Sequence, residues 1–289
     1  DSCQGCDRLS GLDFRTWRPR QPSKSLIDRA GGTGHNAAAM TDYRDILTFK
    51  KDRHAVIQLN RPEKMNALAH NLRAEVFDAL KDYEADPEVR VIIIRGSGRA
   101  FSAGYDLSGI SHTDDDRDYV EKRSGLPNVG PIHPGQGQWP QHLLSGYWQI
   151  IGYPPVRAMT PVDICYHPWN MHQKKVRELL YTGDSVTGLE AVEIGWANRA
   201  VPIDQLCDAT EAFAERIANV DGPMLQMTKR QVNRAYEIMG IRTALAAGGD
   251  IQEMGRARPG GEQFGRIARE KGLKAALDWR DSPFGDYGS

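Results

Sequence analysis

The chain has 289 residues, 40% of them hydrophobic and 26% charged, which is an ordinary balance for a globular protein with a sizeable core. Its formal net charge of −1 gives no overall field that would favour nucleic acid or an anionic membrane as a partner. No stretch approaches the roughly 20 apolar residues that span a bilayer, and the N-terminus lacks the apolar region of a secretory signal. Because four cysteines are also too few for a disulfide scaffold, we expect a cytoplasmic protein that acts on a small molecule.

Residues 1–39 differ in composition from the rest, since Ser, Gly, Arg, Pro and Gln dominate and no helix or strand period persists. We interpret them as a disordered extension, or as upstream sequence translated ahead of a natural start at Met40. Cys3 and Cys6 form a C-x-x-C pair of the kind found in zinc and redox sites. No second Cys or His pair lies nearby, so a chance pair is favoured and no metal site is expected.

The patterned region begins near residue 43. Residues 46–50 and 55–59 are β-prone runs separated by a polar turn, which predicts a hairpin. Asn66 is a plausible N-cap for a helix that Asp86-Pro87 would end. The apolar face of that helix repeats at helical spacing and consists of Leu68, Leu72, Val76, Leu80 and Tyr83.

Residues 91–94 form a continuous apolar run, which is typical of a strand covered on both faces. Strand, helix and strand in this order predict a right-handed crossover and a layered α/β arrangement. Residues 111–140 resemble a long loop, in which His112 and the acidic run 114–116 are more typical of solvated side chains than of a metal site. Mostly helical sequence follows, and we expect helices at about 173–180, 208–218, 223–239, 241–257 and 263–279.

The segment 99–107, RAFSAGYDL, carries the strongest chemical signal. Small residues at Ser102 and Ala103 let a ligand approach the backbone, and Gly104 can adopt unusual dihedral angles. Backbone N–H groups after such a turn can donate to an oxyanion. From composition alone, a tight strand-to-helix connection without a ligand explains the segment equally well.

Four motifs in order resemble those of the crotonase (enoyl-CoA hydratase/isomerase) superfamily, and the similarity runs from about residue 43 to 284. They are LNRPEKMNAL at 59–68, AFSAGYDL at 100–107, LYTGD at 180–184 with NRAVP at 198–202, and GLKAALDWRDSPF at 272–284. The resemblance implies a crotonase-like α/β spiral of ββα units, with the core at 40–202 and a helical oligomerisation region at 203–289. It also implies an acyl-CoA thioester as substrate with no other cofactor, a homotrimer or homohexamer, and no nucleic acid or membrane partner.

The resemblance also assigns site residues. The backbone N–H of Tyr105 matches one of two donors that hold the thioester oxygen, and such a donor contributes roughly 2.7–4 kcal/mol in comparable sites. The residues that match the walls of the CoA channel are Met65, Ala67, Leu68, Ala100, Ala103, Gly104, Asp106 and Leu107.

One internal block of the family pattern is missing where residues 148–151 run directly into GYPPVR at 152–157. The absent block is on the order of 40 residues, about the size of one strand–helix–strand unit. It should supply two buried strands, the second oxyanion donor and one catalytic glutamate. A degenerate paralogue, a segment lost in gene prediction, or a rearrangement using residues 111–150 would each explain it, and the second is favoured because both flanks match closely.

The acid/base pair of a hydratase is also missing, since Pro155 stands where the family carries its second glutamate. Hydration of an alkene needs one group to activate water and another to protonate the α-carbon. Nearby acidic and imidazole side chains are more typical of exposed or structural groups; they are Glu178, Glu190, Glu193, His167 and His172. We therefore carry three hypotheses: a family enzyme, a non-catalytic acyl-CoA-binding or assembly subunit, and a zinc or redox protein acting through Cys3 and Cys6.

Overall fold

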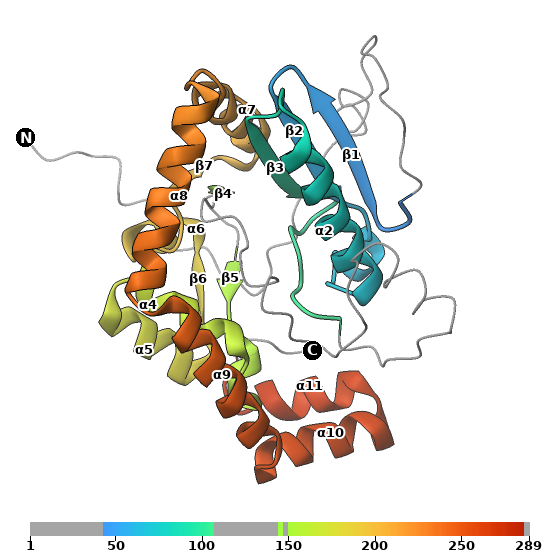
Figure 1. Cartoon of the computed structure of the whole chain (residues 1–289). Coiled ribbons are helices and arrows are strands. Elements are labelled where there is room, and N and C mark those ends of the chain that lie inside the picture. Colours follow the sequence, from blue (N-terminus) through green and yellow to red (C-terminus); the bar gives the residue numbers. More distant parts are fainter. Residues whose placement is uncertain (1–42, 107–143, 147–149, 286–289) are drawn as a thin grey trace, which may run out of the picture. The chain divides into compact units, whose positions relative to one another are not determined.

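A computed structural model describes residues 43–106, 144–146 and 150–285 of the chain. The chain divides into two units, Asp1–Ala39 and Met40–Ser289, and the described residues all belong to the second. The C-x-x-C pair, the acidic run at 114–116 and the whole loop expected at 111–140 lie outside the described residues. Helices and strands are both present (Figure 1), as expected for an α/β fold.

Seven short strands are described, and they are β1 (Ile46–Lys51), β2 (His54–Leu59), β3 (Val91–Gly96), β4 (Leu144–Gly146), β5 (Ile150–Gly152), β6 (Ser185–Thr187) and β7 (Arg199–Val201). The described α-helices are α2 (His70–Ala85), α4 (His167–Asn170), α5 (Gln173–Thr182), α6 (Gly188–Glu193), α7 (Leu206–Ala218), α8 (Gly222–Ile238), α9 (Ile241–Arg256), α10 (Pro259–Lys271) and α11 (Leu273–Asp281). Short 3-10 turns connect them, including η2 (Pro62–Lys64), η3 (Pro154–Arg157), η4 (Val162–Tyr166) and η5 (Ile203–Gln205).

The largest described sheet has the order β1-β2-β3. The β1–β2 hairpin is antiparallel and β2 pairs with β3 in parallel, so both strand predictions are confirmed. The parallel pairing requires a crossover, and α2 provides it. Helix α2 covers one face of this sheet through a cluster of buried apolar side chains: Ile46, Ile57, Leu59, Leu72, Val76 and Ala79.

Strand β3 is less covered than its apolar sequence predicts. Only Ile93 of the strand is buried, while Val91, Ile92 and Ile94 are partly buried. Val56 and Ile93 pack against Ala214 of α7 on the face away from α2. Within the described part of the chain, β2 is the only strand that β3 pairs with. On the other face, Ile92 and Ile94 pack against the cluster that α2 covers. The prediction that this strand is covered on both faces is therefore confirmed, although the cover is partial.

The remaining described strands form two small sheets. Strand β4 runs parallel to β7, and β5 runs antiparallel to β6. On either side of β6, helix α5 ends at Gly183, which has a left-handed φ of 72°, and helix α6 begins with a capping box between Thr187 and Glu190. A hydrogen bond from the Thr187 backbone N–H holds the pKa of Glu190 below its usual value. These elements correspond to the third motif of the sequence.

The C-terminal region is helical as predicted, with one difference. A single helix was expected at 263–279, but the structure has two helices, α10 and α11, separated at Gly272 with φ 87°. This φ lies in the left-handed region that favours glycine, which ends α10 there. In the described part of the chain, no helix is long and apolar enough to cross a membrane.

A buried arginine joins the second half of the described structure. The Arg157 side chain is 1% exposed, and its Nε donates to the carbonyl oxygen of Thr182 at 2.8 Å. Its two terminal nitrogens lie 3.3 Å from carboxylate oxygens of Asp184 and Asp281. The Phe284 ring centroid lies 3.8 Å from the guanidinium carbon. One guanidinium thus connects η3, the turn after α5 and the end of α11.

The packing around Arg157 leaves no room for other side chains at Gly183. A Cβ there would lie 2.9 Å from the Arg157 Nε and 3.2 Å from a methyl carbon of Val156. Asp281 is also held by Arg280, whose Nε and Nη2 lie 2.8 and 2.7 Å from its two oxygens. Because the charges of Arg157, Arg280 and Asp281 are all buried, removing one of them unbalances the charge of the network.

We expect Arg157→Met to lower the free energy of unfolding by about 3 kcal/mol, because it removes one partner from a buried ion-pair network. Guanidinium denaturation followed by circular dichroism measures this change. The matched control Arg266→Met alters an exposed arginine of α10 and should change stability by less than about 0.5 kcal/mol. Equal effects of the two substitutions would contradict the role given to Arg157.

Candidate active site

The two first sequence motifs meet at the buried side chain of Asn66. Its Oδ1 accepts a hydrogen bond from the Arg61 backbone N–H at 2.9 Å. Its Nδ2 donates to the carbonyl oxygens of Ser97 and Ala100 at 2.9 and 2.8 Å. Asn66 is fully buried and has φ 53°, a left-handed conformation that asparagine tolerates better than most residues. The amide therefore fastens the segment 59–68 to the loop that follows β3.

The prediction that Asn66 caps the following helix is wrong. Helix α2 starts at His70, with Ala69 at the N-cap position and no side-chain cap hydrogen bond. A capping residue bonds to the N–H of the helical residues two or three positions later, whereas Asn66 bonds to residues 31 and 34 positions later. Gly96 makes room for this arrangement, since a Cβ there would lie 2.8 Å from Asn66 Nδ2 and 2.5 Å from two carbonyl oxygens.

The turn at residues 102–106 is attached to the segment 65–68 by further hydrogen bonds. The Ala103 N–H donates to the carbonyl of Met65 at 2.9 Å, and the Leu68 N–H donates to the carbonyl of Gly104 at 2.8 Å. The Ser102 hydroxyl donates to the carbonyl of Asn66 at 2.9 Å. Leu68 and Tyr105 form an isolated parallel bridge. The two motifs expected to form the channel walls thus lie side by side.

The conformation of the turn depends on glycine at one position. Gly104 has φ 84°, a value that other residues rarely adopt, and no heavy atom lies within 4 Å of the Cβ that could be built on it. Its N–H donates to the Ser102 hydroxyl at 3.1 Å. Ala103, Gly104 and Tyr105 are all exposed. The turn is therefore accessible at the surface, as a ligand-binding backbone segment must be.

An arginine supports the turn from the other side. Arg61 Nη1 donates to the carbonyl of Ala67 at 2.9 Å and to the carboxylate of Asp106 at 3.1 Å. Its Nε also lies 3.8 Å from an oxygen of Asp45. Burial raises the pKa of Asp45, against the opposing effect of Arg61. The Asp106 carboxylate, predicted on a channel wall, is therefore engaged with Arg61 inside the turn.

The remaining candidate residues surround this turn. Met65 is 39% exposed and Tyr105 is 42% exposed, and the guanidinium carbon of Arg73 lies 5.4 Å from the Tyr105 ring centroid. Burial lowers the pKa of Arg73. Ala67, Leu68 and Ala100 are partly buried, and Leu107 lies outside the described residues.

The structure also places the side chains that were considered as acid/base groups. Pro155 lies in the 3-10 turn η3 and offers no titratable group there. The ring centroid of His167 lies 5.4 Å from that of Tyr153 and 5.3 Å from that of Trp196, within an aromatic cluster. Glu190 belongs to the capping box of α6. The described residues contain no group of three or more His, Cys, Asp and Glu that could hold a metal ion.

Three residues that shape the site were not recognised in the sequence as site residues. Asn66 was assigned to a helix cap, and Arg61 and Gly96 were given no role. The sequence does contain a sign of the first two, because Arg61 and Asn66 both belong to the motif LNRPEKMNAL. A polar pair within an otherwise structural motif points to long-range hydrogen bonds.

Comparisons with known proteins show which family the chain resembles. Residues 50–129 match the Enoyl-CoA hydratase/isomerase family. The Mycobacterium tuberculosis protein EchA13, named as an enoyl-CoA hydratase, is 28% identical over 296 residues, covering 84% of this chain and 89% of its own length. A crystal structure of an enoyl-CoA hydratase/isomerase from Xanthobacter autotrophicus is 31% identical with a TM-score of 0.69, covering 84% of this chain and 99% of that chain.

A further crystal structure, of an enoyl-CoA hydratase from Mycobacterium smegmatis, is 27% identical with a TM-score of 0.69 and covers 85% of this chain and 96% of that chain. These similarities agree with the ordered motifs and with the α/β fold and its helical C-terminal region. Together they define the class of protein. The chain belongs to the enoyl-CoA hydratase/isomerase family of enzymes, the crotonase superfamily.

We expect Asn66→Gly to lower the free energy of unfolding by about 3 kcal/mol or more, because the Arg61 N–H and two carbonyls lose their buried partner. Glycine keeps the left-handed φ, so the loss reports the hydrogen bonds and not backbone strain. Urea denaturation measures it. The control Asn71→Gly removes an asparagine from the first turns of α2 and should cost only about 1 kcal/mol. Asn66 would have no special role if the two variants were equally stable.

Proposed function

We propose that this chain is an acyl-CoA-binding enzyme that stabilises a thioester enolate at the turn 102–106. One observation supports this most directly: the hydrogen bonds of Asn66 hold that exposed turn beside Met65 and Leu68. In the proposed complex the pantetheine chain follows 65–68, and the Tyr105 N–H donates to the thioester oxygen. Family membership supports the substrate class, since the relatives are named for enoyl-CoA chemistry.

The turn has to stabilise negative charge on one oxygen atom of the substrate. Removing a proton from the carbon next to a thioester, or adding a nucleophile to its conjugated double bond, places negative charge on the carbonyl oxygen. A backbone N–H fixed in advance stabilises this charge without reorganising during the reaction. The amides on either side of Tyr105 already form hydrogen bonds, Gly104 to the Ser102 hydroxyl and Asp106 to the Leu68 carbonyl, which restricts the direction of the backbone between them. The arrangement thus supplies orientation as well as a donor.

Spectroscopy with cinnamoyl-CoA tests the proposed donor without requiring turnover. Hydrogen bonds to the carbonyl polarise the conjugated thioester, so its absorbance should move to longer wavelength when the ligand binds. Tyr105→Pro removes the N–H and should abolish most of the shift, because such donors contribute roughly 2.7–4 kcal/mol in comparable sites. Tyr105→Phe keeps both the N–H and an aromatic ring, so it should retain the shift.

A second variant keeps the test informative if proline disturbs folding. Gly104→Ala adds a methyl group to open space but strains a backbone with φ 84°, so it should weaken the shift by changing the turn alone. Circular dichroism verifies that each variant is folded. A wild-type complex without any shift, or an unchanged shift in folded Tyr105→Pro and Gly104→Ala, would contradict the proposal.

A second candidate function is a non-catalytic acyl-CoA-binding or assembly subunit. The observation that favours it is Pro155 in η3, at the position where the resemblance expects a glutamate. The match to EchA13 extends over 296 residues but uses only 84% of a 289-residue chain, which supports a missing internal block. Incubation with crotonyl-CoA and a panel of acyl-CoAs separates the functions: turnover supports the enzyme, and binding without turnover supports the subunit.

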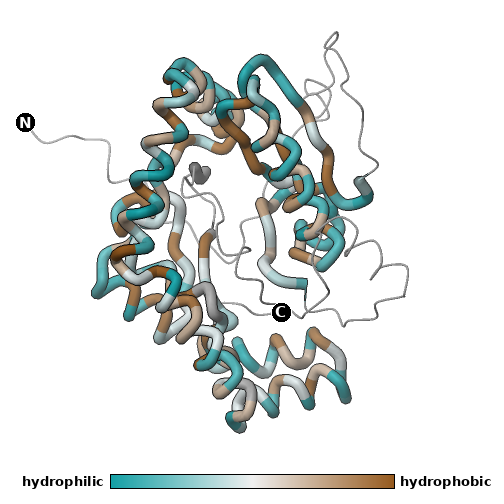
Figure 2. The backbone as a smooth tube through the Cα atoms, viewed as in Figure 1, coloured by the Kyte–Doolittle hydropathy of each residue, from teal (hydrophilic) through white to brown (hydrophobic). Residues whose placement is uncertain are grey.

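We also propose that the chain assembles as a homotrimer or homohexamer, with α8 at the contact. Only Gly222 among the 17 residues of α8 is buried, although a surface helix normally buries its apolar stripe. Figure 2 shows polar and apolar residues alternating along this helix. The stripe is between 44% and 75% exposed and consists of Met224, Met227, Val232, Ile238 and Met239.

The face of α8 opposite this stripe is mostly polar and forms a described ion pair with α2. Lys229 on that face lies 3.6 Å from a carboxylate oxygen of Glu84 in α2. The apolar stripe of α8 is therefore directed away from α2. A second copy of the chain would bury these methionine and isoleucine side chains, each fully buried one contributing about 1.5–3 kcal/mol.

Sedimentation equilibrium tests the proposed assembly. The full chain should sediment as a trimer or hexamer, and Met227→Asp with Ile238→Asp should shift it to monomer, because two carboxylates would be desolvated at the contact. Gln226→Asp with Asn233→Asp adds the same charge to the polar face and should leave the assembly intact. A monomeric wild-type chain, or an intact assembly after the first pair of substitutions, would overturn the proposal.

A further inference from the structure

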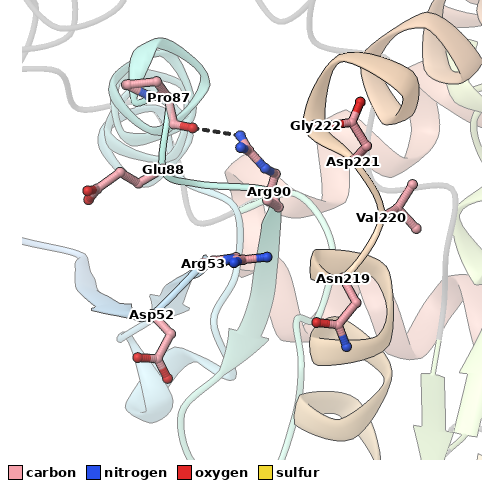
Figure 3. A pocket seen from close by; sticks show the side chains of 9 residues that line it. All are labelled: Asp52, Arg53, Pro87, Glu88, Arg90, Asn219, Val220, Asp221 and Gly222. Atoms are coloured by element: carbon pink, nitrogen blue, oxygen red, sulfur yellow. Dashed lines mark hydrogen bonds between the residues drawn. The ribbon is translucent and has the colours of Figure 1, made fainter.

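A cavity of about 420 Å³ lies far from the candidate active site. Three connections line it: the β1–β2 turn, the segment between α2 and β3, and the segment between α7 and α8. Figure 3 shows its labelled side chains. The cavity adjoins the starts of β2 and β3, whereas the candidate active site follows their ends. Since the strands rise about 3.3 Å per residue, the two places are separated by roughly the length of the sheet.

Two arginines of this cavity are held next to each other. The Arg90 backbone N–H donates to the Arg53 carbonyl at 2.7 Å. The guanidinium groups are fixed by main-chain carbonyls: Arg90 donates to Pro87 at 2.6 Å and Arg53 to Ala218 at 3.3 Å. Neither guanidinium forms an ion pair with any described carboxylate. Two like charges that line one cavity repel each other, and a bound anion would offset this repulsion.

Two of the three carboxylates that line the cavity are engaged elsewhere. Glu88 pairs with Lys50 at 2.8 Å, and Asp221 caps α8 by accepting from the Met224 N–H at 3.2 Å. The Asp221 carboxylate thus serves the first turn of α8. In Figure 3 the side chain of Arg53 points towards the α7–α8 segment, while the carboxylates of Asp52 and Glu88 point away from it.

Glycine at position 222 preserves the space for Arg90. A Cβ on Gly222 would lie 2.5 Å from the guanidinium carbon of Arg90 and 2.8 Å from two of its nitrogens. Any larger residue would therefore displace this guanidinium. The cavity volume falls within the range of small-molecule sites, and paired guanidinium groups match the oxygen geometry of phosphate.

We propose that this cavity binds a phosphate-bearing small molecule through Arg53 and Arg90, at a site separate from the candidate acyl-CoA site. The ligand accepts hydrogen bonds from the guanidinium nitrogens that the two main-chain carbonyls leave available. Occupation of the site links the β1–β2 turn to the α7–α8 connection, so the ligand stabilises the junction between the sheet and the C-terminal helices.

Calorimetric titration of the full chain with inorganic pyrophosphate tests the site. The wild-type chain should bind it, and Arg53→Gln and Arg90→Gln should each weaken binding about tenfold or more, as expected for loss of a charge-assisted hydrogen bond. Gly222→Ala should also weaken binding without changing any charge. Arg266→Gln, a matched loss of charge on α10, should bind as the wild type does.

A competition experiment separates this site from the acyl-CoA site, since coenzyme A also carries phosphates. With saturating pyrophosphate present, the affinity for crotonyl-CoA should be unchanged. The proposal is overturned if the wild-type chain does not bind pyrophosphate, if the two arginine variants bind as tightly as Arg266→Gln, or if pyrophosphate displaces crotonyl-CoA. The acyl-CoA proposal is tested by its own spectral shift, so either site can fail without the other.

Discussion

The candidate active site depends on one buried amide. Asn66 bonds to the main chain at Arg61, Ser97 and Ala100, so it joins the end of β2 to the loop after β3 over a long stretch of sequence. A buried amide is stabilising only when its donors and acceptors are satisfied, and here three main-chain groups satisfy it. This requirement fixes the position of the loop and explains why Gly96 has no side chain.

The position of the loop after β3 in turn determines the conformation of the turn 102–106. Once Ala103 and Gly104 are bonded to Met65 and Leu68, the intervening backbone has little freedom, and Gly104 absorbs the sharp change of direction with its positive φ. The turn is then exposed while its supports are buried. This combination of a rigid backing and an accessible backbone is what a preorganised oxyanion site requires.

A second junction organises the rest of the described chain around Arg157. Its guanidinium contacts elements from η3 to the end of α11. The third and fourth sequence motifs thus converge on a single charge of the segment GYPPVR, just as the first two motifs converge on Asn66. In the described part, β4 and β5 pair with β7 and β6 and not with β3. Asn66 thus connects two ends of the largest described sheet, and Arg157 connects helical elements beside the β5–β6 pair, while apolar clusters form the core.

Periodicity was sufficient to predict the hairpin, α2, β3 and most C-terminal helices, because these elements express local patterns of apolar residues and proline. The break at Gly272 was missed because a helical pattern tolerates an isolated glycine, and only its φ of 87° reveals the interruption. Asn66 was misassigned for a related reason: asparagine caps helices locally, and its actual partners are about 30 residues away. The order of the motifs was enough to propose the site residues. Their hydrogen-bond partners could not be predicted, because these lie far away in the sequence and are brought close only by folding.

The measurement that tests the central claim most directly is a crystal structure of this chain with a bound acyl-CoA thioester. The account predicts the thioester oxygen about 2.7–3.1 Å from the Tyr105 nitrogen, with the pantetheine chain alongside Met65 and Leu68. A thioester bound elsewhere, or a Tyr105 N–H directed into its own chain in that complex, would contradict it.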